Sequence, residues 1–361
     1  MRSRPLIAGG ARSSIRGGEG LAMDRSRRGQ APGLRSRASG RGALTIVAAV
    51  LAGLAFAPVP HGAETVSARS VFRAFSHSSE WNKPLPRDAP IDRRSAEIIS
   101  RIQGYQNAGY PRLTISSWSE PTYFSDAGDP RYTVNPGSSG PRLVGVHIPR
   151  GASPAPTSDA QMTVFDRAKG VVFKLHRAAY ESSTDTWTAD GTSEYDLDSN
   201  GLECTLRGSD RRCPMNSGHR GIPPAIHAIR FDEVRSALSG GRGIRHTIKI
   251  ALDETAGCHV YPAGGHEDGE GGVLTCEGLI LRIRPGIGLR ARGLSGGCLY
   301  IARALQTYGA VVGDTGGVAM EIKMENEGSS RSWADLGVST NCFEGKISLS
   351  DFQVIRRGYH R

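Results

Sequence analysis

Short runs in which hydrophobic and polar residues alternate dominate most of the chain, and this period of two is that of β-strands. The run 161–166 is followed by a run at 171–180, in which every second residue from Val171 to Leu175 is apolar. Gly170 lies between the two runs and suits a tight turn. The pattern therefore predicts a β-hairpin.

Similar runs predict further strands, whereas helical spacing is rare. The expected strands are a strand pair at 186–197 and single strands at 244–251, 278–284, 309–312, 318–324 and 347–356. The expected helices cover 92–103, 231–238 and 299–308. In the first helix Ile91, Ile98, Ile99 and Ile102 share one side, and Gly104 follows as a stop. Many short strands with glycine-rich turns predict an all-β fold: an antiparallel β-sandwich of jelly-roll type with a few short helices.

The longest apolar run, Ala43 to Ala57, follows a leader of ten arginines that contains no lysine. Its 15 residues are short for a bilayer core of roughly 30 Å, and prolines and small residues follow it instead of a charge cluster. We therefore expect a secretory signal peptide, with an uncleaved membrane anchor as the alternative. Because the leader is long for a signal peptide, Met23 is a candidate for the true start.

These features divide the chain into three expected parts. Residues 1–63 form the basic leader and signal peptide, and 64–90 form an extended N-terminal segment. Pro84 and Pro86 in that segment exclude a helix, because each proline forces its predecessor into extended geometry. Residues 91–361 are expected to form a single β-sandwich domain.

The net charge of +10 taken alone suggests a nucleic-acid partner, but the charge is unevenly distributed along the chain. Residues 1–42 carry ten arginines and two acidic residues, and the remainder carries 35 basic and 33 acidic residues. The mature protein is therefore nearly neutral, which argues against a nucleic-acid partner. We expect a secreted or periplasmic protein of the cell envelope that does not stay inserted in a membrane after signal cleavage.

The cysteines are even in number and all follow the leader, which predicts disulfides in an exported protein. Sequence does not choose among the 15 pairings of six cysteines. Nearest-neighbour pairing closes loops that a β-rich domain accommodates. It would join Cys204 to Cys213, Cys258 to Cys276 and Cys298 to Cys342.

Carboxylate pairs cleave glycosidic bonds, one acting as acid and the other as base or nucleophile. Asp159 and Asp166 flank the first strand of the predicted hairpin, and Asp314 lies between two expected strands. Asp166 and Asp314 also suit plain turn positions. Asp159 is therefore the better catalytic candidate, with Asp314 as the candidate partner.

His246 alternates with isoleucines at 244, 248 and 250 and so shares their face of the expected strand. It is either a hydrogen-bonded core residue or, if that face is the floor of a cleft, a general base or acid. His219 and Arg220 lie in a glycine-flanked loop. Arg220 is either a ligand for a carboxylate or sugar hydroxyl, or a structural residue that binds loop carbonyls.

Aromatic rings that stack on sugars are a further candidate feature. The four tryptophans and Tyr261 form no regular stripe along the chain. Core packing is the expectation for most of them, and Tyr261 is retained as a candidate substrate-binding ring.

Ser295 lies in Gly-Leu-Ser-Gly-Gly, which matches the G-x-S-x-G pattern of serine hydrolases. The match is weak in a chain with 47 glycines, and no α/β pattern surrounds it.

A histidine- and acid-containing loop lies between two of the cysteines, with His259, His266, Glu267 and Asp268. The spacing matches no specific metal-binding pattern, so a solvated loop is expected, and no cofactor is predicted apart from Ca²⁺ as a candidate ion.

Several segments together resemble a group of secreted β-rich proteins from GC-rich bacteria. In sequence order they are 82–86, 147–149, 158–164, 218–223, 244–246 and 308–314. The resemblance spans most of 80–356 and implies export and a β-rich domain, but no particular reaction. Members of the group tend to have His where this chain has Gln161, a candidate substrate-binding residue.

The first functional hypothesis is a secreted enzyme that cleaves an extracellular or cell-wall polysaccharide. Hydrolysis would use Asp159 with Asp314 or another carboxylate, and lyase chemistry would use His246 as base with Arg220 on a uronate carboxylate. The alternatives are a non-catalytic glycan-binding or envelope-structural protein and, less favoured, a hydrolase that uses Ser295.

Overall fold

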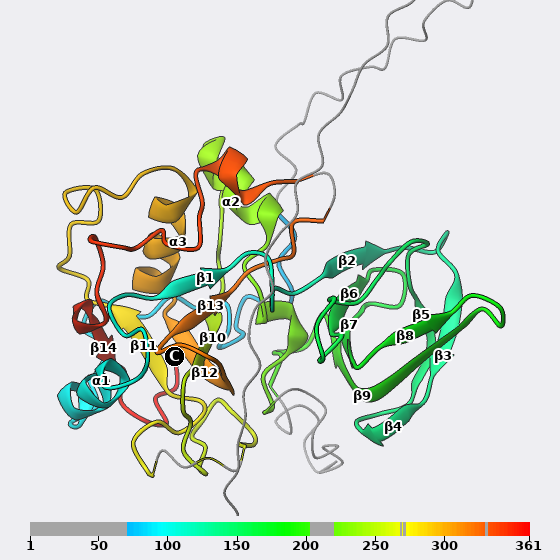
Figure 1. Ribbon diagram of the computed structural model, residues 1–361, viewed down its shortest axis with the longest axis horizontal. Coiled ribbons are helices and arrows are strands. Elements are labelled where there is room, and N and C mark those ends of the chain that lie inside the picture. The colour runs from blue at the N-terminus through cyan, green and yellow to red at the C-terminus, as the bar shows by residue number, and fades with distance from the viewer. Residues whose placement is uncertain (1–70, 203–219, 268, 270–271, 329–330) are drawn as a thin grey trace, which may run out of the picture. The chain divides into compact units, whose positions relative to one another are not determined.

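The structure, a computed structural model, describes residues 71–202 and 220–361 apart from 268, 270–271 and 329–330 (Figure 1). Within these residues the chain forms 14 strands, three α-helices and three short 3-10 helices. The helices are α1 (Ser95–Gln103), α2 (Phe231–Leu238), α3 (Gly296–Thr307), η1 (Pro224–Ile226), η2 (Trp333–Leu336) and η3 (Leu349–Asp351). The fold is mostly β with few helices, as the sequence pattern predicts.

The first sheet has six strands in the order β1-β13-β10-β12-β11-β14. They are β1 (Arg112–Thr114), β13 (Glu321–Lys323), β10 (Ile248–Leu252), β12 (Ala310–Thr315), β11 (Ile280–Ile283) and β14 (Phe352–Val354). Ile98 of α1, Val234 of α2 and Leu305 of α3 are buried in one core cluster with Ile250 and Val312 of this sheet. The helices therefore bury their apolar faces against the sheet, and this burial favours folding.

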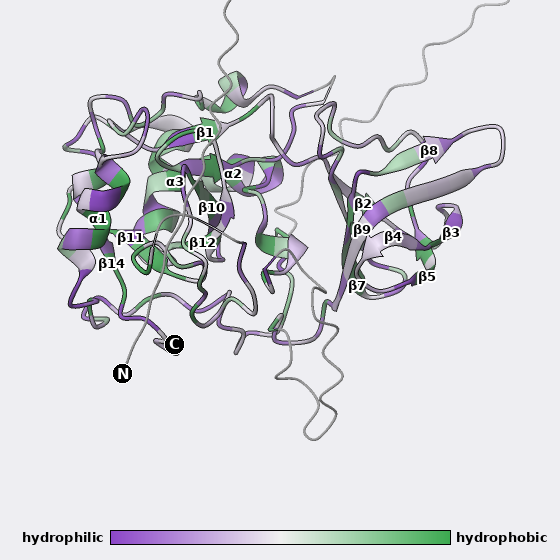
Figure 2. Cartoon of the chain, turned by 60° about the horizontal axis from the view of Figure 1, so that its bottom comes forward, coloured by the Kyte–Doolittle hydropathy of each residue, from purple (hydrophilic) through white to green (hydrophobic). Residues whose placement is uncertain are grey.

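The second sheet has the order β2-β6-β7-β9-β4, with β8 added beside β9. Its strands are β2 (Thr122–Ser125), β6 (Met162–Asp166), β7 (Val171–His176), β9 (Thr186–Asp196), β4 (Pro136–Ser139) and β8 (Ala179–Glu181). A separate pair, β3 (Arg131–Val134) with β5 (Leu143–His147), lies beside it. These strands curl around their own core cluster, which includes Val134, Val164 and Phe173 (Figure 2).

Both large sheets are mixed, which differs from the purely antiparallel pairing expected. In the first sheet β1 pairs with β13 and β10 pairs with β12 in parallel. In the second sheet β2 pairs with β6 and β4 pairs with β9 in parallel. Parallel neighbours require crossover connections, which an alternating hydrophobic pattern does not reveal.

The predicted hairpin is confirmed as β6 and β7, which pair antiparallel with Val164 opposite Phe173. Gly170 occupies the turn with φ of +76°, a conformation that glycine adopts without strain. Val171 and Phe173 face the core of the second sheet, whereas Val172 faces a different cluster. The hairpin therefore has two buried faces, one inside the curl and one toward the first sheet.

Several expected elements differ from the structure, and the strand expected at 347–356 is reduced to β14 at Phe352–Val354 after η3. Residues 186–197 form one long strand, β9, instead of a strand pair. Strand β10 begins at Ile248, so His246 precedes the strand instead of lying within it. Helix α1 has Ile98, Ile99 and Ile102 buried as predicted, but Ile91 is exposed before the helix and bridges to Ile355.

A third core cluster connects the two sheets. It contains Val172 of β7, Val311 of β12 and the segment from Ile222 to Ile226. Val311 points opposite to Val312, because neighbouring residues of a strand face opposite sides. The first sheet thus uses one face for the helices and part of the other for the second sheet.

Glu120 adds a polar connection between the sheets. Its backbone N–H donates to the Met324 carbonyl just after β13, at 2.8 Å. Its buried carboxylate accepts from Thr163 Oγ1 of β6 at 2.7 Å and from Lys174 Nζ of β7 at 2.9 Å. One residue is therefore bonded to both sheets at the point where they meet.

Two disulfides are formed among the described residues, Cys258–Cys276 and Cys298–Cys342, as nearest-neighbour pairing predicts. The first closes a loop, and the second joins the start of α3 to a later turn. Cys204 and Cys213 lie outside the described residues. Disulfides fit an oxidising compartment, in line with the predicted export.

The described residues belong to one unit, Glu64–Arg361, while Ala43 to Ala57 lies outside them. No helix in the described part of the chain is long and apolar enough to cross a membrane. The predicted leader, signal peptide and domain bounds stay predictions.

Replacing Cys298 and Cys342 together by alanine should lower the free energy of unfolding by about 2–4 kcal/mol, because the unfolded chain regains the freedom of a long closed loop. Urea denaturation of the oxidised protein and of the double variant measures the difference. Equal midpoints would contradict a stabilising role for this disulfide.

Candidate functional site

A polar cleft of about 540 Å³ lies between the two sheets. Strands β7 and β9 contribute one wall, and the ends of β10, β12 and β13 contribute the other. Its volume is within the roughly 300–1,000 Å³ of ordinary ligand sites. Four carboxylates, four cationic side chains and two histidines line it, which makes it far more polar than such sites usually are.

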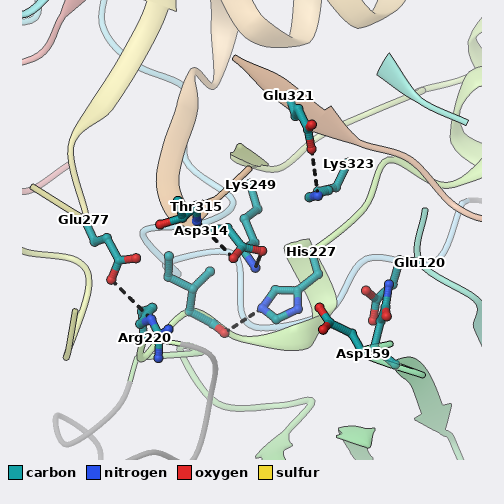
Figure 3. A network of polar contacts seen from close by, with 12 residues as sticks. Glu120, Asp159, Arg220, His227, Lys249, Glu277, Asp314, Thr315, Glu321 and Lys323 are labelled. Carbon is teal, nitrogen blue, oxygen red and sulfur yellow. Dashed lines mark hydrogen bonds and ion pairs between the residues drawn. The ribbon is translucent and has the colours of Figure 1, made fainter. Parts of the chain in front are cut away.

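Lys249 and Asp314 form the ion pair on the first-sheet wall, with 3.0 Å between Nζ and Oδ2 (Figure 3). Lys249 lies on the face of β10 opposite Ile248 and Ile250, which pack against the helices. Only 2% of its side chain is exposed. Burial lowers the pKa of Lys249, and the charge of Asp314 opposes that shift.

Lys174 of β7 belongs to the second-sheet wall of the cleft and contacts Glu120 and His227. Its Nζ donates to Glu120 at 2.9 Å and lies 3.2 Å from His227 Nδ1. His227 Nε2 lies 2.9 Å from the Ile222 carbonyl oxygen (Figure 3). Because a carbonyl oxygen accepts only, the neutral ring carries its proton on Nε2 and presents Nδ1 to the lysine as an acceptor.

Arg220 binds two carboxylates at the edge of the cleft. It forms an ion pair with Glu267, and its Nε lies 3.5 Å from Glu277 Oε2. Glu277 is fully buried, and burial raises its pKa to about 7, although Arg220 and Lys249 oppose the shift. Near neutral pH this carboxyl therefore exists in both protonation states.

Asp159 lies in the loop before β6 with its side chain half exposed, 3.8 Å from His176 Nε2 of β7. Gln161 is buried beside it and donates from Nε2 to the Ser119 carbonyl at 3.0 Å. Asp159, Gln161, Arg220 and Asp314 all line the cleft. The fold thus gathers four of the predicted candidates from distant parts of the sequence.

Other predicted site residues lie elsewhere. His246 is buried beneath α2, with Nε2 at 3.2 Å from Glu233 and Nδ1 at 2.7 Å from the Thr247 carbonyl, and it does not line the cleft. This corresponds to the core-residue alternative. Tyr261 also lies away from the cleft and stacks on His360. His219 lies outside the described residues.

The sequence offered a turn role for both Asp314 and Asp166, and the structure gives that role only to Asp166. Asp314 is inside strand β12 instead of the turn that follows. Asp166 is fully buried and accepts the Lys169 N–H of the hairpin turn at 2.9 Å, which is the turn role predicted for it.

Ser295 is the N-cap residue of α3, and turns instead of a strand precede it. A nucleophile elbow needs a strand before the serine, and Ser295 does not line the cleft. The hydrolase alternative thus gains no support from this geometry.

The histidine-containing loop places His259 Nδ1 and His266 Nδ1 2.8 Å apart. Glu267 turns toward Arg220 and Thr315. Among the described residues no group of three or more metal-ligating side chains occurs, and Asp268 lies outside them. Ca²⁺ therefore stays an expectation from the sequence.

Several cleft residues are not among the candidates predicted from the sequence, and Trp118 and Lys249 are examples. Trp118 is 44% exposed and lines the cleft, whereas Trp81, Trp187 and Trp333 are buried. The sequence gives no signal for this difference, because buried Trp81 and Trp187 also have polar sequence neighbours. Lys249 alternates with the apolar residues Ile248 and Ile250, so the pattern of its strand predicts only an outward-facing polar residue there.

Comparison with protein-family models, with curated proteins and with solved structures finds no match for this chain.

Replacing Glu277 by Gln should remove a pH dependence of stability. An ordinary glutamate pKa of 4.5 in the unfolded chain and about 7 in the folded protein mean that the folded state holds the proton more tightly. The free energy of unfolding should fall as pH rises from 4.5 to 7, and the variant should be more stable than wild type at pH 8 by roughly 1–3 kcal/mol.

Urea denaturation at pH 5 and pH 8 tests this prediction, with the exposed Glu344→Gln as the matched control. If wild type and Glu277→Gln lose the same stability between the two pH values, the proposed titration of Glu277 is wrong.

Proposed function

We propose that this protein is a secreted enzyme that binds a polysaccharide in the cleft between the two sheets and cleaves it. The observation that carries the proposal is the convergence of Asp159, Arg220 and Asp314, with the exposed ring of Trp118, on one polar cleft. Carboxylates and amines supply the proton transfers that cleavage needs. The ring offers an apolar face for a sugar.

Extracellular action fits two further features of the chain. The disulfides suit an oxidising compartment, and the apolar run behind the basic leader suits export. The proposal rests on the cleft and does not require the jelly-roll connection of strands, which stays a prediction.

A non-catalytic glycan-binding role is the second candidate. The observation in its favour is that each cationic side chain lining the cleft already contacts a carboxylate, as in Lys174 with Glu120 and Lys323 with Glu321. Such balanced pairs hold a rigid polar surface that can bind sugar hydroxyls without reacting.

Incubation of the purified protein with a panel of neutral and uronate-containing polysaccharides tests the proposal, with products analysed by mass. We expect shorter products from at least one polymer, and a loss of rate of about 10²-fold or more in Asp159→Asn if this carboxylate transfers a proton. Binding without any shorter product would favour the second candidate.

Replacing Trp118 by Ala should weaken oligosaccharide binding about tenfold, a loss of about 1.4 kcal/mol, because the stacking face is removed. Isothermal titration calorimetry with an oligosaccharide of the polymer that binds measures the change. Tyr180→Ala is the matched control, since Tyr180 is 45% exposed and lies outside the cleft. Equal affinity of both variants would place the sugar elsewhere.

A further inference from the structure

The lysines of this chain are concentrated at the cleft. The chain has six lysines among 45 basic residues, so arginine is the usual basic residue. Three of the six, Lys174, Lys249 and Lys323, line the cleft and come from β7, β10 and β13. Lysine differs from arginine chiefly in that its amine can lose a proton near physiological pH when it is buried. The cleft is therefore lined by basic side chains of the type that can act as a proton acceptor.

Lys249 has the environment of a proton-transfer amine. Its Nζ is fixed by Asp314 Oδ2 at 3.0 Å, and its side chain is almost completely buried. The charges of Lys174 and Lys323 add to the effect of burial in lowering its pKa, while Asp314 and the nearby Glu277 favour the charged form. Asp314 orients the amine from the next strand, because β10 and β12 are parallel neighbours.

Three of the four carboxylates that line the cleft are already bound by neighbouring side chains, and the fourth, Asp159, is half exposed at its edge. Glu120 accepts from Lys174 and Thr163, Asp314 accepts from Lys249, and Glu267 accepts from Thr315. A glycosidase needs one carboxyl free to give its proton to the leaving oxygen, whereas these three carboxylates already accept hydrogen bonds from their neighbours. The arrangement thus favours a base over an acid.

The cations around Lys249 fit a substrate that itself carries a carboxylate. Lys323 uses one of its three N–H groups on Glu321, at 3.0 Å, and lies near Lys249 in the cleft (Figure 3). A uronate carboxylate at this place would be stabilised by the ammonium groups. Negative charge that develops on it during proton removal would be stabilised further.

We propose that the cleft cleaves a uronate-containing polysaccharide by β-elimination, with the Lys249 amine as the base and Asp314 as the residue that positions it. This inference rests on the proposed function and names the substrate class and reaction of the same site. Lys249 thus takes the place of His246 as the base of the lyase hypothesis, because His246 does not line the cleft.

The step balances without a cofactor or an oxidant. The neutral Lys249 amine takes the proton from C5 of the uronate, the electron pair forms the C4–C5 double bond, and the C4–O4 bond breaks. The departing O4 takes a proton from water, and Lys249 returns its proton to the hydroxide so formed. The products are a new chain end with a hydroxyl and an unsaturated uronate end that absorbs ultraviolet light.

Lys249→Arg is the decisive variant, because arginine keeps the positive charge opposite Asp314 but stays protonated at any assay pH. We expect this variant to bind uronate oligosaccharide within about threefold of wild type and to lose 10²-fold or more in kcat. Lys249→Met should lose kcat as well, and its circular dichroism and Tm show whether it folds. If it does not fold, Lys249→Arg decides.

The assay uses the full chain with pectate, alginate and hyaluronate as uronate polymers and with neutral polymers as controls, and follows ultraviolet absorbance together with product mass. Wild-type kcat should rise with pH as Lys249 loses its proton. Lys346→Met, a lysine outside the cleft, is the matched control and should retain wild-type kcat.

Ultraviolet-absorbing products from a uronate polymer, with Lys249→Arg inactive but able to bind, support the inference. Saturated products that contain an oxygen atom from labelled water overturn it and leave the proposed function standing. Full elimination activity in Lys249→Arg overturns the assignment of the base. Absence of cleavage of every polymer overturns the proposed function and the inference together.

Discussion

The hydrogen bonds of Glu120 hold the two sheets in the relation on which the cleft depends. The main chain of this residue is bonded to the segment after β13, and its carboxylate is bonded to β6 and β7. Burying a carboxylate is costly unless it is hydrogen-bonded and paired, and Lys174 and Thr163 provide both. Lys174 therefore has two tasks, since it neutralises the buried charge and supplies one cation of the cleft wall.

The two faces of the first sheet have different roles, since one packs against the helices and the other borders the cleft. Isoleucines of β10 pack against the helices, and the alternate residue, Lys249, turns toward the cleft. Beyond the apolar cluster that contains Val172 and Val311, polar side chains of both sheets line a cleft that a ligand can enter. The ion pair of Lys249 with Asp314 lies in that space because their strands are neighbours. The chemistry proposed for the site is thus a consequence of mixed strand pairing, which puts β10 beside β12.

Much of the local structure was predictable from the sequence, and the strand order was not. The hairpin of β6 and β7, the buried face of α1, the helix at Phe231–Leu238 and two disulfides follow from periodicity, turn residues and cysteine spacing. Parallel pairing depends on contacts between distant segments, and periodicity carries no information about it. The residue types of the cleft candidates were recognisable in the sequence, namely Asp159, Gln161, Arg220 and Asp314. Their position in one cleft was not, because it too depends on contacts between distant segments. The strand expected to contain His246 begins two residues after it. Trp118 and Lys249 were not predicted as site residues, because periodicity does not show which positions line a cleft.

The central claim is that the cleft between the sheets is where a carbohydrate binds. The most direct measurement is a crystal structure of the protein with a uronate oligosaccharide bound. We expect a sugar ring on Trp118 and a uronate whose C5 lies within reach of Lys249 Nζ, with its carboxylate toward Lys323. An oligosaccharide bound on another surface, with the cleft empty, would contradict the account.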